Sequence, residues 1–536
     1  MTEATFDYIV VGGGSGGNVV AARLVEAGNS VLVLEAGRSD RHPFIHAPAG
    51  LFMLRDTGHA TCHATVPQAH ANGRVMYIPT GSVLGGGSSV NGMIYMRGEP
   101  QDYDEWRDGG ATGWGWADVL PFFRKSEANQ RLAGEMHGTV GPLPVSDPTY
   151  VHPLSHAFLR AAQQAGHPWN HDFNQGATRG NRHGQLGVGF YQTTTRGGQR
   201  ASTSTAFLSR VRRDRKLTVW VDSPVTGLVL DGRRATGVRV KRMGGGEKIV
   251  GARAGVVLAA GTLVTPKLLM LSGIGPGGHL NEFGIKTEID LSGVGQNLHD
   301  HLEVQISARL KGPVSLGRER AGLRGIRHGL EWLLQRSGVL TSTIVEAGGF
   351  FDTDDDGRPD IQIHVVPAFS GDVDREPPSG HGLCIDPGFL RPKSRGELRL
   401  ANADPRTAPI IDPHYLEAPE DVATLVRGVR LTREFLRQPA LADLVSEEVL
   451  PGTGVTSAEA VEDFVRQYAK TTYHPVGTCR MGTDKEAVVD PELKLRGAEN
   501  IWIADASVMP SIVSGNTNAP TIMIGERAAE FIFRSG

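Results

Sequence analysis

The chain has 536 residues and carries 55 Lys and Arg against 58 Asp and Glu, so its formal net charge is −3. This length exceeds what one hydrophobic core usually holds, so we expect two domains. The balanced charge argues against nucleic acid as the main partner. Three cysteines in so long a chain are typical of a reduced compartment. The N-terminus has no basic segment and no apolar run approaches the roughly 20 residues of a membrane span, so we expect a soluble cytoplasmic protein without a signal peptide.

The N-terminal segment predicts a dinucleotide-binding unit. An apolar run at 8–11 is typical of a strand buried on both faces. The run is followed by G-x-G-x-x-G and the start of a helix, formed by Gly12, Gly14, Ser15 and Gly17. The first glycine allows a tight turn, the second lets the backbone approach a pyrophosphate, and the third lets helix and strand pack closely. Glu35 ends the next apolar strand, where a carboxylate can accept hydrogen bonds from ribose hydroxyls.

This fingerprint does not separate NAD from FAD, but later segments favour FAD. Residues 79–98 read PTGSVLGGGSSVNGMIYMRG and residues 261–275 read GTLVTPKLLMLSGIG. Both resemble the signatures of the glucose–methanol–choline (GMC) flavoprotein oxidoreductases. Further landmarks of that family follow in order, among them YHPVGTCRMG at 473–482 and DASVMPSIVSGNTNAPTIMIGERAAEFI at 505–532. The resemblance covers almost the whole chain and looks closest to the bacterial choline, alkanol and sorbose dehydrogenases.

The resemblance implies an α/β fold with two parts. A Rossmann-like FAD-binding domain is expected to contain a parallel sheet, and a substrate domain of α+β type is expected to contain an antiparallel sheet with covering helices. We expect the FAD-binding domain to comprise residues 1–150, 200–305 and 480–536. The substrate domain is then expected from residues 151–199 and 306–479. The first domain must be discontinuous, because the last signature has to return to the flavin.

The resemblance also implies further cofactor contacts. These are carried over onto Val83, Gly87, Asn91, Val225, Asp505, Ala506 and Thr517. Some family members link the flavin covalently to a histidine in the first signature, and Val90 occupies that position here. Valine cannot form such a bond, so we expect non-covalent FAD.

His474 of the HPVGT segment is the candidate base. A zinc site would need more ligands than the neighbouring Cys479, and nothing nearby suggests acyl chemistry by a Cys–His pair. From the residue alone, a packed core histidine remains an alternative. The resemblance implies that His474 removes the hydroxyl proton of an alcohol and that Asn516 binds the alkoxide, with Asn518 as a structural neighbour. It also places Tyr473 at the substrate, with core packing as the alternative role of that side chain.

The implied activity is the FAD-dependent oxidation of a primary alcohol to the aldehyde, by hydride transfer to flavin N5. A polyol or sugar-like alcohol is included in this substrate class. The electron acceptor is expected to be a quinone, a dye-like acceptor or O₂. Alternatives are an O₂-using alcohol oxidase, a hydroxynitrile lyase in which FAD undergoes no redox change, and a non-catalytic nucleotide-binding module.

Two other segments carry weaker patterns. HATCHATVPQAH at 59–70 holds His59, Cys62, His63 and His70, but their spacing fits no closed zinc pattern, so we predict no metal site. The stretch 310–340 is basic and then amphipathic. Its basic residues include Arg318, Arg320, Arg324 and Arg327. These residues are compatible with peripheral contact with an anionic membrane, where a quinone would be found, but a solvated helix and loop covering the substrate domain is the more ordinary explanation.

Overall fold

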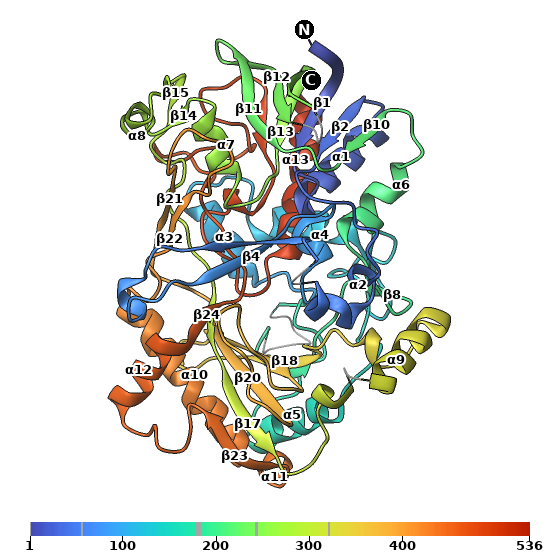
Figure 1. Cartoon of the computed structure of the whole chain (residues 1–536), viewed down its shortest axis with the longest axis vertical. Helices are drawn as coiled ribbons and strands as arrows, with labels where there is room; N and C mark the ends of the chain where they lie inside the picture. Colours follow the sequence, from blue (N-terminus) through green and yellow to red (C-terminus); the bar gives the residue numbers. More distant parts are fainter. Residues whose placement is uncertain (1, 55–56, 177–183, 242–244, 320–321, 536) are drawn as a thin grey trace.

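The structure is a computed structural model that describes residues 2–54, 57–176, 184–241, 245–319 and 322–535. Two large sheets lie at opposite ends of the molecule (Figure 1). The sheet near the chain termini is mainly parallel, and the other is antiparallel. The predicted fold class is therefore confirmed.

The parallel sheet is built around the N-terminal strand. Its order is β10-β2-β1-β13-β12-β11, with β25 beside β13. The parallel members are β1 (Thr2–Val11), β2 (Val31–Leu34), β10 (Leu217–Trp220), β13 (Glu247–Leu258) and β25 (Ile501–Ile503). The antiparallel members are β11 (Val225–Asp231) and β12 (Arg234–Lys241). Every residue of β2 is buried, as expected for an apolar strand covered on both faces.

Two helices bring the ends of the chain together against this sheet. Helix α1 (Ser15–Glu26) follows the glycine turn, and α13 (Asn518–Ser535) packs along it (Figure 1). The Ser15 hydroxyl donates to Asn518 Oδ1 at 2.8 Å. The guanidinium of Arg23 donates to both carboxylate oxygens of Glu526, at 2.9 and 2.6 Å. The last signature therefore lies against the N-terminal fingerprint.

The antiparallel sheet has the order β23-β17-β20-β19-β18-β7, with β16 and β24 at one side. Its strands are β7 (Gly187–Phe190), β16 (Leu302–Val304), β17 (Ile306–Leu310), β18 (Ala347–Phe351), β19 (Ile361–Val366), β20 (Gly382–Phe389), β23 (Val445–Leu450) and β24 (Ala469–Thr471). Side chains alternate between its faces. One face joins a hydrophobic core with α5 (Pro153–Gln164), α10 (Pro419–Arg437) and α12 (Ala458–Tyr468).

The assignment of strands bears on the expected domain boundaries. β16 falls inside 200–305, which we expected in the FAD-binding domain, yet it pairs with β20 and β24 of the antiparallel sheet. The residue boundaries themselves stay a prediction.

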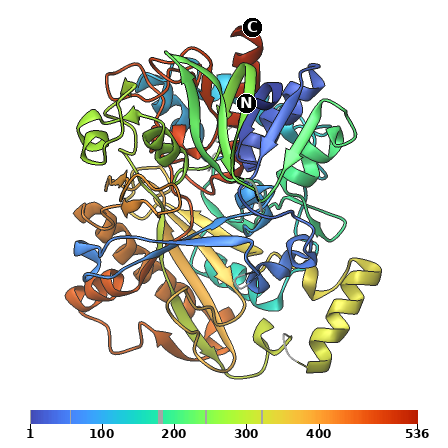
Figure 2. The ribbon, with the colours of Figure 1, turned by 45° about the horizontal axis from the view of Figure 1, so that its top comes forward.

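A hairpin crosses between the two parts. Strands β3 (Ala60–Ala64) and β4 (Tyr77–Gly81) pair with each other and run across the molecule in both views (Figures 1 and 2). At its far end Arg74 donates to the carbonyl of Ala469 at 2.8 Å, and Arg466 donates to the carbonyl of His70 at 2.8 Å. The hairpin thus ties the first third of the chain to α12 and β24.

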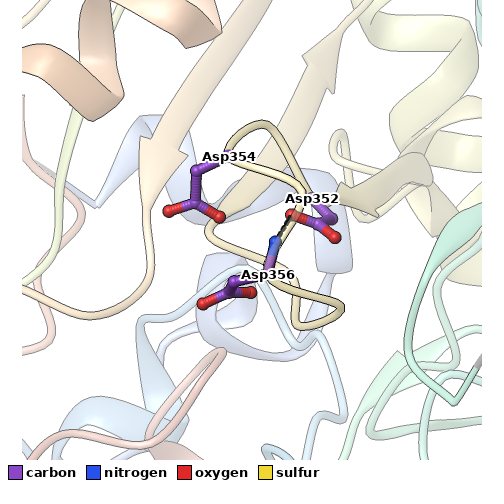
Figure 3. A group of neighbouring side chains, drawn as sticks. All are labelled: Asp352, Asp354 and Asp356. Atoms are coloured by element: carbon purple, nitrogen blue, oxygen red, sulfur yellow. Dashed lines mark hydrogen bonds between the residues drawn. The ribbon is translucent and has the colours of Figure 1, made fainter.

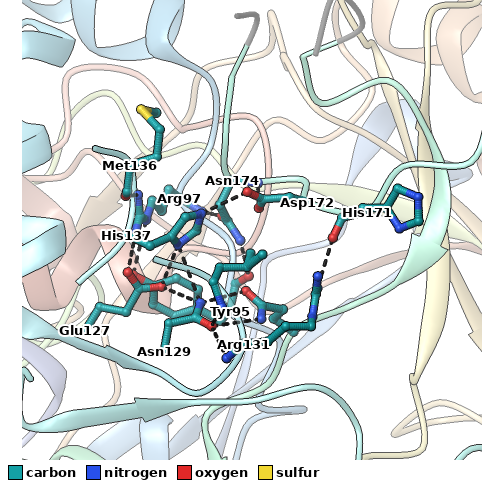
Figure 4. Close-up of polar contacts among 12 residues, drawn as sticks. Tyr95, Arg97, Glu127, Asn129, Arg131, Met136, His137, His171, Asp172 and Asn174 are labelled. Carbon is teal, nitrogen blue, oxygen red and sulfur yellow. Dashed lines mark hydrogen bonds and ion pairs between the residues drawn. The ribbon is translucent and has the colours of Figure 1, made fainter. Parts of the chain in front are cut away.

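A buried ionic network holds the C-terminal end of the glycine-rich segment 79–98 in place (Figure 4). The fully buried Arg97 donates to Glu127 at 2.7 Å and to the carbonyl of Met136 at 2.6 Å. His137 bridges Glu127 at 3.0 Å and Asp172 at 2.8 Å. Because each charge has a close partner, the network can remain buried and hold three separate chain segments together.

Candidate active site

The glycine turn has the geometry of a phosphate cradle. Gly12 has φ +103°, and a Cβ there would lie 2.3 Å from the carbonyl oxygen of Ala259. A Cβ on Gly17 would lie 2.0 Å from the carbonyl oxygen of Gly12, so helix and strand touch through backbone alone. At Gly14 the nearest described atom would be 3.7 Å away. Gly14 also caps α1 without a side-chain hydrogen bond, which leaves backbone N–H groups for an anion.

Glu35 lies beside this turn, one residue beyond β2. Its carboxylate accepts the N–H of Gly13 at 2.9 Å and of Gly37 at 2.8 Å. Burial raises the pKa of Glu35 to about 7, although the two backbone N–H groups oppose that shift. The side chain therefore supports the turn from the position predicted for a ribose contact.

The second glycine loop lies against the first. A Cβ on Gly86 would be 2.8 Å from Cα of Gly14, whereas one on Gly87 would meet no described atom within 4 Å. Asn91 is held by Arg200, whose Nη1 donates to the Asn91 carbonyl at 2.6 Å and to Oδ1 at 2.8 Å. Arg200 is buried, and its Nη2 has no hydrogen-bond partner among the described residues. The open cradle and this unpaired donor fit a large anionic cofactor such as FAD.

The other predicted cofactor residues surround these loops in different ways. Val83 is fully buried beside Ile45 and Leu54, and Val225 begins β11. Asp505 accepts hydrogen bonds from Gly261, Thr265 and Ser507, so protein donors already occupy its carboxylate. A cofactor contact at Asp505 would therefore come from its backbone. Ala506 begins a short 3₁₀ turn, and the buried Thr517 precedes α13. Val90 packs at the edge of the Val83 cluster.

His474 is held on a strained backbone turn after β24. The preceding Tyr473 has φ +67°, an uncommon conformation for a non-glycine residue, and the residue is 44% exposed. The backbone N–H of His474 donates to Asp300 at 2.8 Å. Asp300 also accepts from the Tyr415 hydroxyl at 2.8 Å and from the Thr471 hydroxyl. These contacts fix the backbone that carries the imidazole.

The hydrogen bonds assign the tautomer of His474. His301 Nε2 lies 2.9 Å from the Leu390 carbonyl, which can only accept, so His301 carries its proton there. Its Nδ1 is then an acceptor, and His474 Nδ1 lies 3.2 Å away. The proton of His474 is consequently on Nδ1, and its Nε2 presents a lone pair. Desolvation, reinforced by His301 and His364, lowers the pKa of His474 well below its ordinary value and keeps the ring neutral.

Asn516 faces that lone pair. Its Nδ2 lies 3.3 Å from His474 Nε2, and its Oδ1 accepts from Gln362 Nε2 at 3.1 Å. Gln362 therefore orients the amide so that its N–H groups point toward His474. Asn518 instead binds Ser15 of the glycine turn at 2.8 Å.

Sequence reasoning missed several of these neighbours. Asp300 and His301 contact His474 directly, yet no motif in the sequence analysis predicted a role for them. The available signal was the sequence His-Asp-His at 299–301. Gln362 and Arg200 lie in no recognisable motif. Only the fold brings them to the site.

The histidines and the cysteine of segment 59–70 do not form a cluster of metal ligands. No three of His59, Cys62, His63 and His70 have ligand atoms within 4.8 Å of one another. In the described part of the chain, one such group consists of Asp352, Asp354 and Asp356 on a surface loop (Figure 3). Arg391 lies 3.0 Å from Asp356 and Arg427 lies 3.5 Å from Asp354, so arginines already compensate this loop.

The GMC oxidoreductase family model matches the chain over residues 6–303 and 392–525. The chain belongs to the GMC oxidoreductase family. It is 41% identical over 535 residues to the alcohol dehydrogenase (acceptor) of Pseudomonas putida, with 99% of this chain and 96% of the relative covered. It is 40% identical over 539 residues to the mitochondrial choline dehydrogenase of Homo sapiens, with 98% and 89% covered. The crystal structure of pyridoxine 4-oxidase from Mesorbium loti superposes with a TM-score of 0.87, at 32% identity and 98% coverage of both chains.

Family membership defines the general chemistry. GMC oxidoreductases are FAD-dependent enzymes that act on CH–OH groups, and this chain is an enzyme of that kind. The predicted resemblance is thereby confirmed. No helix among the described residues combines the length and apolarity needed to cross a membrane.

Proposed function

We propose that this GMC oxidoreductase oxidises a primary alcohol to the aldehyde, with His474 as the base and Asn516 as the alkoxide-binding residue. The observation that carries the proposal is the convergence of His474 Nε2 and Asn516 Nδ2, which lie 3.3 Å apart. One nitrogen offers a lone pair and the other offers N–H groups. A hydroxyl between them can lose its proton to the first while its oxygen accepts from the second.

The chain's residues divide this work. His474 Nε2 takes the hydroxyl proton, since its neutral ring is a competent acceptor near neutral pH. The Asn516 amide donates to the oxygen as negative charge develops, and it needs no change of charge to do so. Gln362, His301 and Asp300 hold these two groups in place. When bound, FAD supplies the acceptor for the hydride of the carbinol carbon.

The cofactor contacts remain those expected from the family. Gly12, Gly14, Ser15, Gly17 and Glu35 are proposed to hold the ADP half. Val83, Gly87, Asn91, Val225, Asp505, Ala506 and Thr517 are proposed to surround the remainder. Val90 offers no atom for a covalent link, so we propose that FAD is bound non-covalently and that acid precipitation releases it.

The choice of electron acceptor is a separate proposal. The names of the two curated relatives favour a dehydrogenase, whereas the name of the structural relative favours an oxidase. We propose the dehydrogenase, with the oxidase as the second candidate. Tyr473, exposed next to His474, is proposed to contact the alcohol.

Anaerobic mixing of the purified flavoprotein with a primary alcohol tests the activity. We expect the 450 nm absorbance of the flavin to bleach and an equivalent of aldehyde to form. Re-oxidation of the same sample by a soluble quinone, but slowly by O₂, would support the dehydrogenase, and rapid re-oxidation by O₂ would favour the oxidase. Flavin that stays oxidised while substrate is consumed would instead indicate a lyase.

We also propose peripheral contact with an anionic membrane, at its cytoplasmic face, through helix α9 (Gly322–Gln335). In both views α9 lies at the periphery of the molecule (Figures 1 and 2). It supplies five of the thirteen large apolar side chains that are exposed in the described part of the chain: Leu323, Ile326, Leu330, Leu333 and Leu334. Trp332 anchors the opposite side, since its indole donates to the Gly198 carbonyl at 2.8 Å.

The charge around this helix suits anionic lipid. Residues 310–340 contain six Lys and Arg against two Asp and Glu, in a chain whose net charge is −3. Arg324 and Arg327 lie on α9 itself. Arg320 and the side chain of Arg318, which were also predicted to contribute, lie outside the described residues. An apolar face with flanking arginines is the usual form of an interfacial helix.

A further inference from the structure

One face of the antiparallel sheet is polar and is directed toward the His474–Asn516 pair. On β19, Ile361 and Ile363 point into the hydrophobic core, whereas Gln362 donates to Asn516 at 3.1 Å. Because side chains two apart on a strand share a face, His364 lies on the same side as Gln362. The character of this polar face therefore influences what can bind beside the catalytic pair.

Four titratable side chains form a cluster on that face. His364 Nδ1 lies 3.0 Å from Glu303 Oε2, and Lys470 Nζ lies 3.3 Å from Glu303 Oε1. Lys470 also lies 3.5 Å from Asp386. The pairing of β16 with β24 places Glu303 directly opposite Lys470. Glu303, Asp386 and Lys470 are all buried, and Lys470 is only four residues before His474.

Some polar atoms of this face lack partners. His364 Nε2, Asp386 Oδ1 and Ser307 Oγ are buried and have no hydrogen-bond partner among the described residues. Buried polar atoms are normally satisfied, so atoms of this kind point to a ligand. Asp386 Oδ1 can accept a hydrogen bond, and so can the hydroxyl oxygen of Ser307. A bound hydroxyl group can donate to them, whereas a quaternary ammonium has no N–H to give.

The ion pairs set the charge that a substrate meets. Burial opposes the charged form of Lys470, but Asp386 and Glu303 outweigh it and raise its pKa well above the ordinary value. Burial raises the pKa of Asp386 to about 7 despite the neighbouring Lys470. The ammonium thus offsets the charge of Glu303, and burial disfavours the ionised form of Asp386. Little net negative charge remains to attract a cation.

We propose that Lys470 determines the substrate class and that the site selects uncharged alcohols over quaternary ammonium alcohols such as choline. This inference rests on the proposed function and restricts the class of primary alcohols that the site accepts. The substrate class proposed here thus differs from choline, which the names of several relatives print.

The test compares choline with 3,3-dimethylbutan-1-ol, which has the same shape but carries carbon in place of the charged nitrogen. Anaerobic flavin reduction by each alcohol gives a specificity ratio for wild type and for Lys470→Gln. We expect wild type to prefer the uncharged alcohol. Loss of one nearby positive charge should shift the ratio toward choline by about 10-fold or more. A wild type that prefers choline, or an unchanged ratio in the variant, would overturn the proposal.

Two further variants keep the test decisive. Lys241→Gln removes the same charge from an exposed position on β12 and should leave the ratio unchanged. Asp386→Asn removes a negative charge from the cluster and should shift the ratio away from choline. If Lys470→Gln does not fold, the direction of the Asp386→Asn shift decides alone, and a shift toward choline or none would overturn the proposal.

A binding measurement separates this inference from the proposed function. Calorimetry of the holoenzyme with tetramethylammonium, an unreactive cation, should show tighter binding in Lys470→Gln than in wild type. If neither alcohol reduces the flavin, the proposed function fails. The calorimetry then decides on Lys470: tighter binding in the variant supports its role, and equal affinity overturns it.

Discussion

At the scale of single residues, the proposed proton transfer depends on which nitrogen of His474 carries the proton. The carbonyl of Leu390 fixes the proton of His301 on Nε2, and His301 in turn fixes that of His474 on Nδ1. A backbone carbonyl thus determines that the lone pair faces Asn516. The low pKa of His474 keeps that lone pair available at neutral pH.

Replacing His474 by alanine should retain FAD and abolish most alcohol-dependent reduction. The expected loss per bound flavin is about 10²–10⁴-fold, the usual contribution of a general base. The defect should shrink as pH rises, because hydroxide then takes over removal of the proton. Anaerobic stopped-flow reduction, normalised to flavin content and repeated across pH, measures it.

The converse outcome is equally clear for His474→Ala. A histidine that merely fills space would leave a cavity and lower stability, yet the enzyme that remains folded would keep its rate per flavin. A near wild-type rate throughout the pH range would therefore remove His474 from the mechanism.

Replacing His301 by leucine tests the tautomer of His474. The variant should slow flavin reduction, because it removes the group that fixes the proton on His474 Nδ1 while Nε2 stays in place.

Sequence motifs predicted the two residues of the proposed catalytic pair but not the residues that hold them in place. His474 and Asn516 lie in contiguous segments whose residue order is itself informative. Gln362 and Lys470 reach the site through strand pairing, and no local pattern distinguishes them from other polar residues in strands. Lys470 in particular is placed by the pairing of β16 with β24, which sets it opposite Glu303, a residue 167 positions earlier in the chain.

At the scale of elements, local patterns predicted the parallel part of the fold better than the antiparallel part. The strand, glycine turn and helix at 2–26 form one consecutive unit, so hydrophobic periodicity and glycine spacing were sufficient. The antiparallel sheet instead joins β16 to β24 from distant parts of the chain. Such registers depend on tertiary packing, which periodicity does not contain. The boundary expected at 305 illustrates this, because β16 belongs to the antiparallel sheet.

Helix α9 carries the element-scale prediction. Ile326 is 62% and Leu330 is 53% exposed, and they lie four residues apart on one side of the helix. The double substitution Ile326→Glu with Leu330→Glu should lower affinity for vesicles containing anionic lipid by about 10-fold or more, because each apolar side chain contributes about 1.5–3 kcal/mol when buried. Co-sedimentation with vesicles of phosphatidylcholine and phosphatidylglycerol measures the change.

A matched control distinguishes binding through α9 from non-specific hydrophobic binding to vesicles. Val140 is 90% exposed on another segment, so Val140→Glu makes the same chemical change elsewhere and should leave vesicle binding intact. Wild type should also bind pure phosphatidylcholine more weakly. Absence of binding by wild type would contradict the membrane proposal. Concentration-dependent dimers that the α9 variant abolishes would assign this face to a second copy of the chain.

At the scale of the whole molecule, Arg358 joins the two parts and the C-terminal signature. It lies in the loop between β18 and β19 and reaches α3 (Pro100–Asp108). There it pairs with Glu99 at 2.8 Å and with Asp102 at 2.5 Å. Asp102 also accepts the backbone N–H of Ser514 at 2.7 Å, two residues before Asn516. One cation therefore connects the antiparallel sheet, α3 and the segment that carries Asn516, the proposed alkoxide-binding residue.

Replacing Arg358 by methionine should destabilise the enzyme in a pH-dependent way. Glu99 and Asp102 would remain buried without their cation, a loss of about 3–5 kcal/mol for a broken buried pair. Burial already raises the pKa of Glu99 to about 7, and Asp102 adds to this shift, while Arg358 opposes it. A carboxyl with a raised folded pKa is tolerated when protonated at low pH and costs stability as pH rises through that pKa. The deficit of the variant should therefore be small near pH 5.5 and large near pH 8, as measured by thermal unfolding of the holoenzyme. Arg406→Met removes an arginine that is 78% exposed and pairs only with Asp404 among the described residues, so it should leave stability nearly unchanged at both pH values. A deficit for Arg358→Met that is equal at both pH values would mean that lost packing, and not the unpaired carboxylates, accounts for the effect.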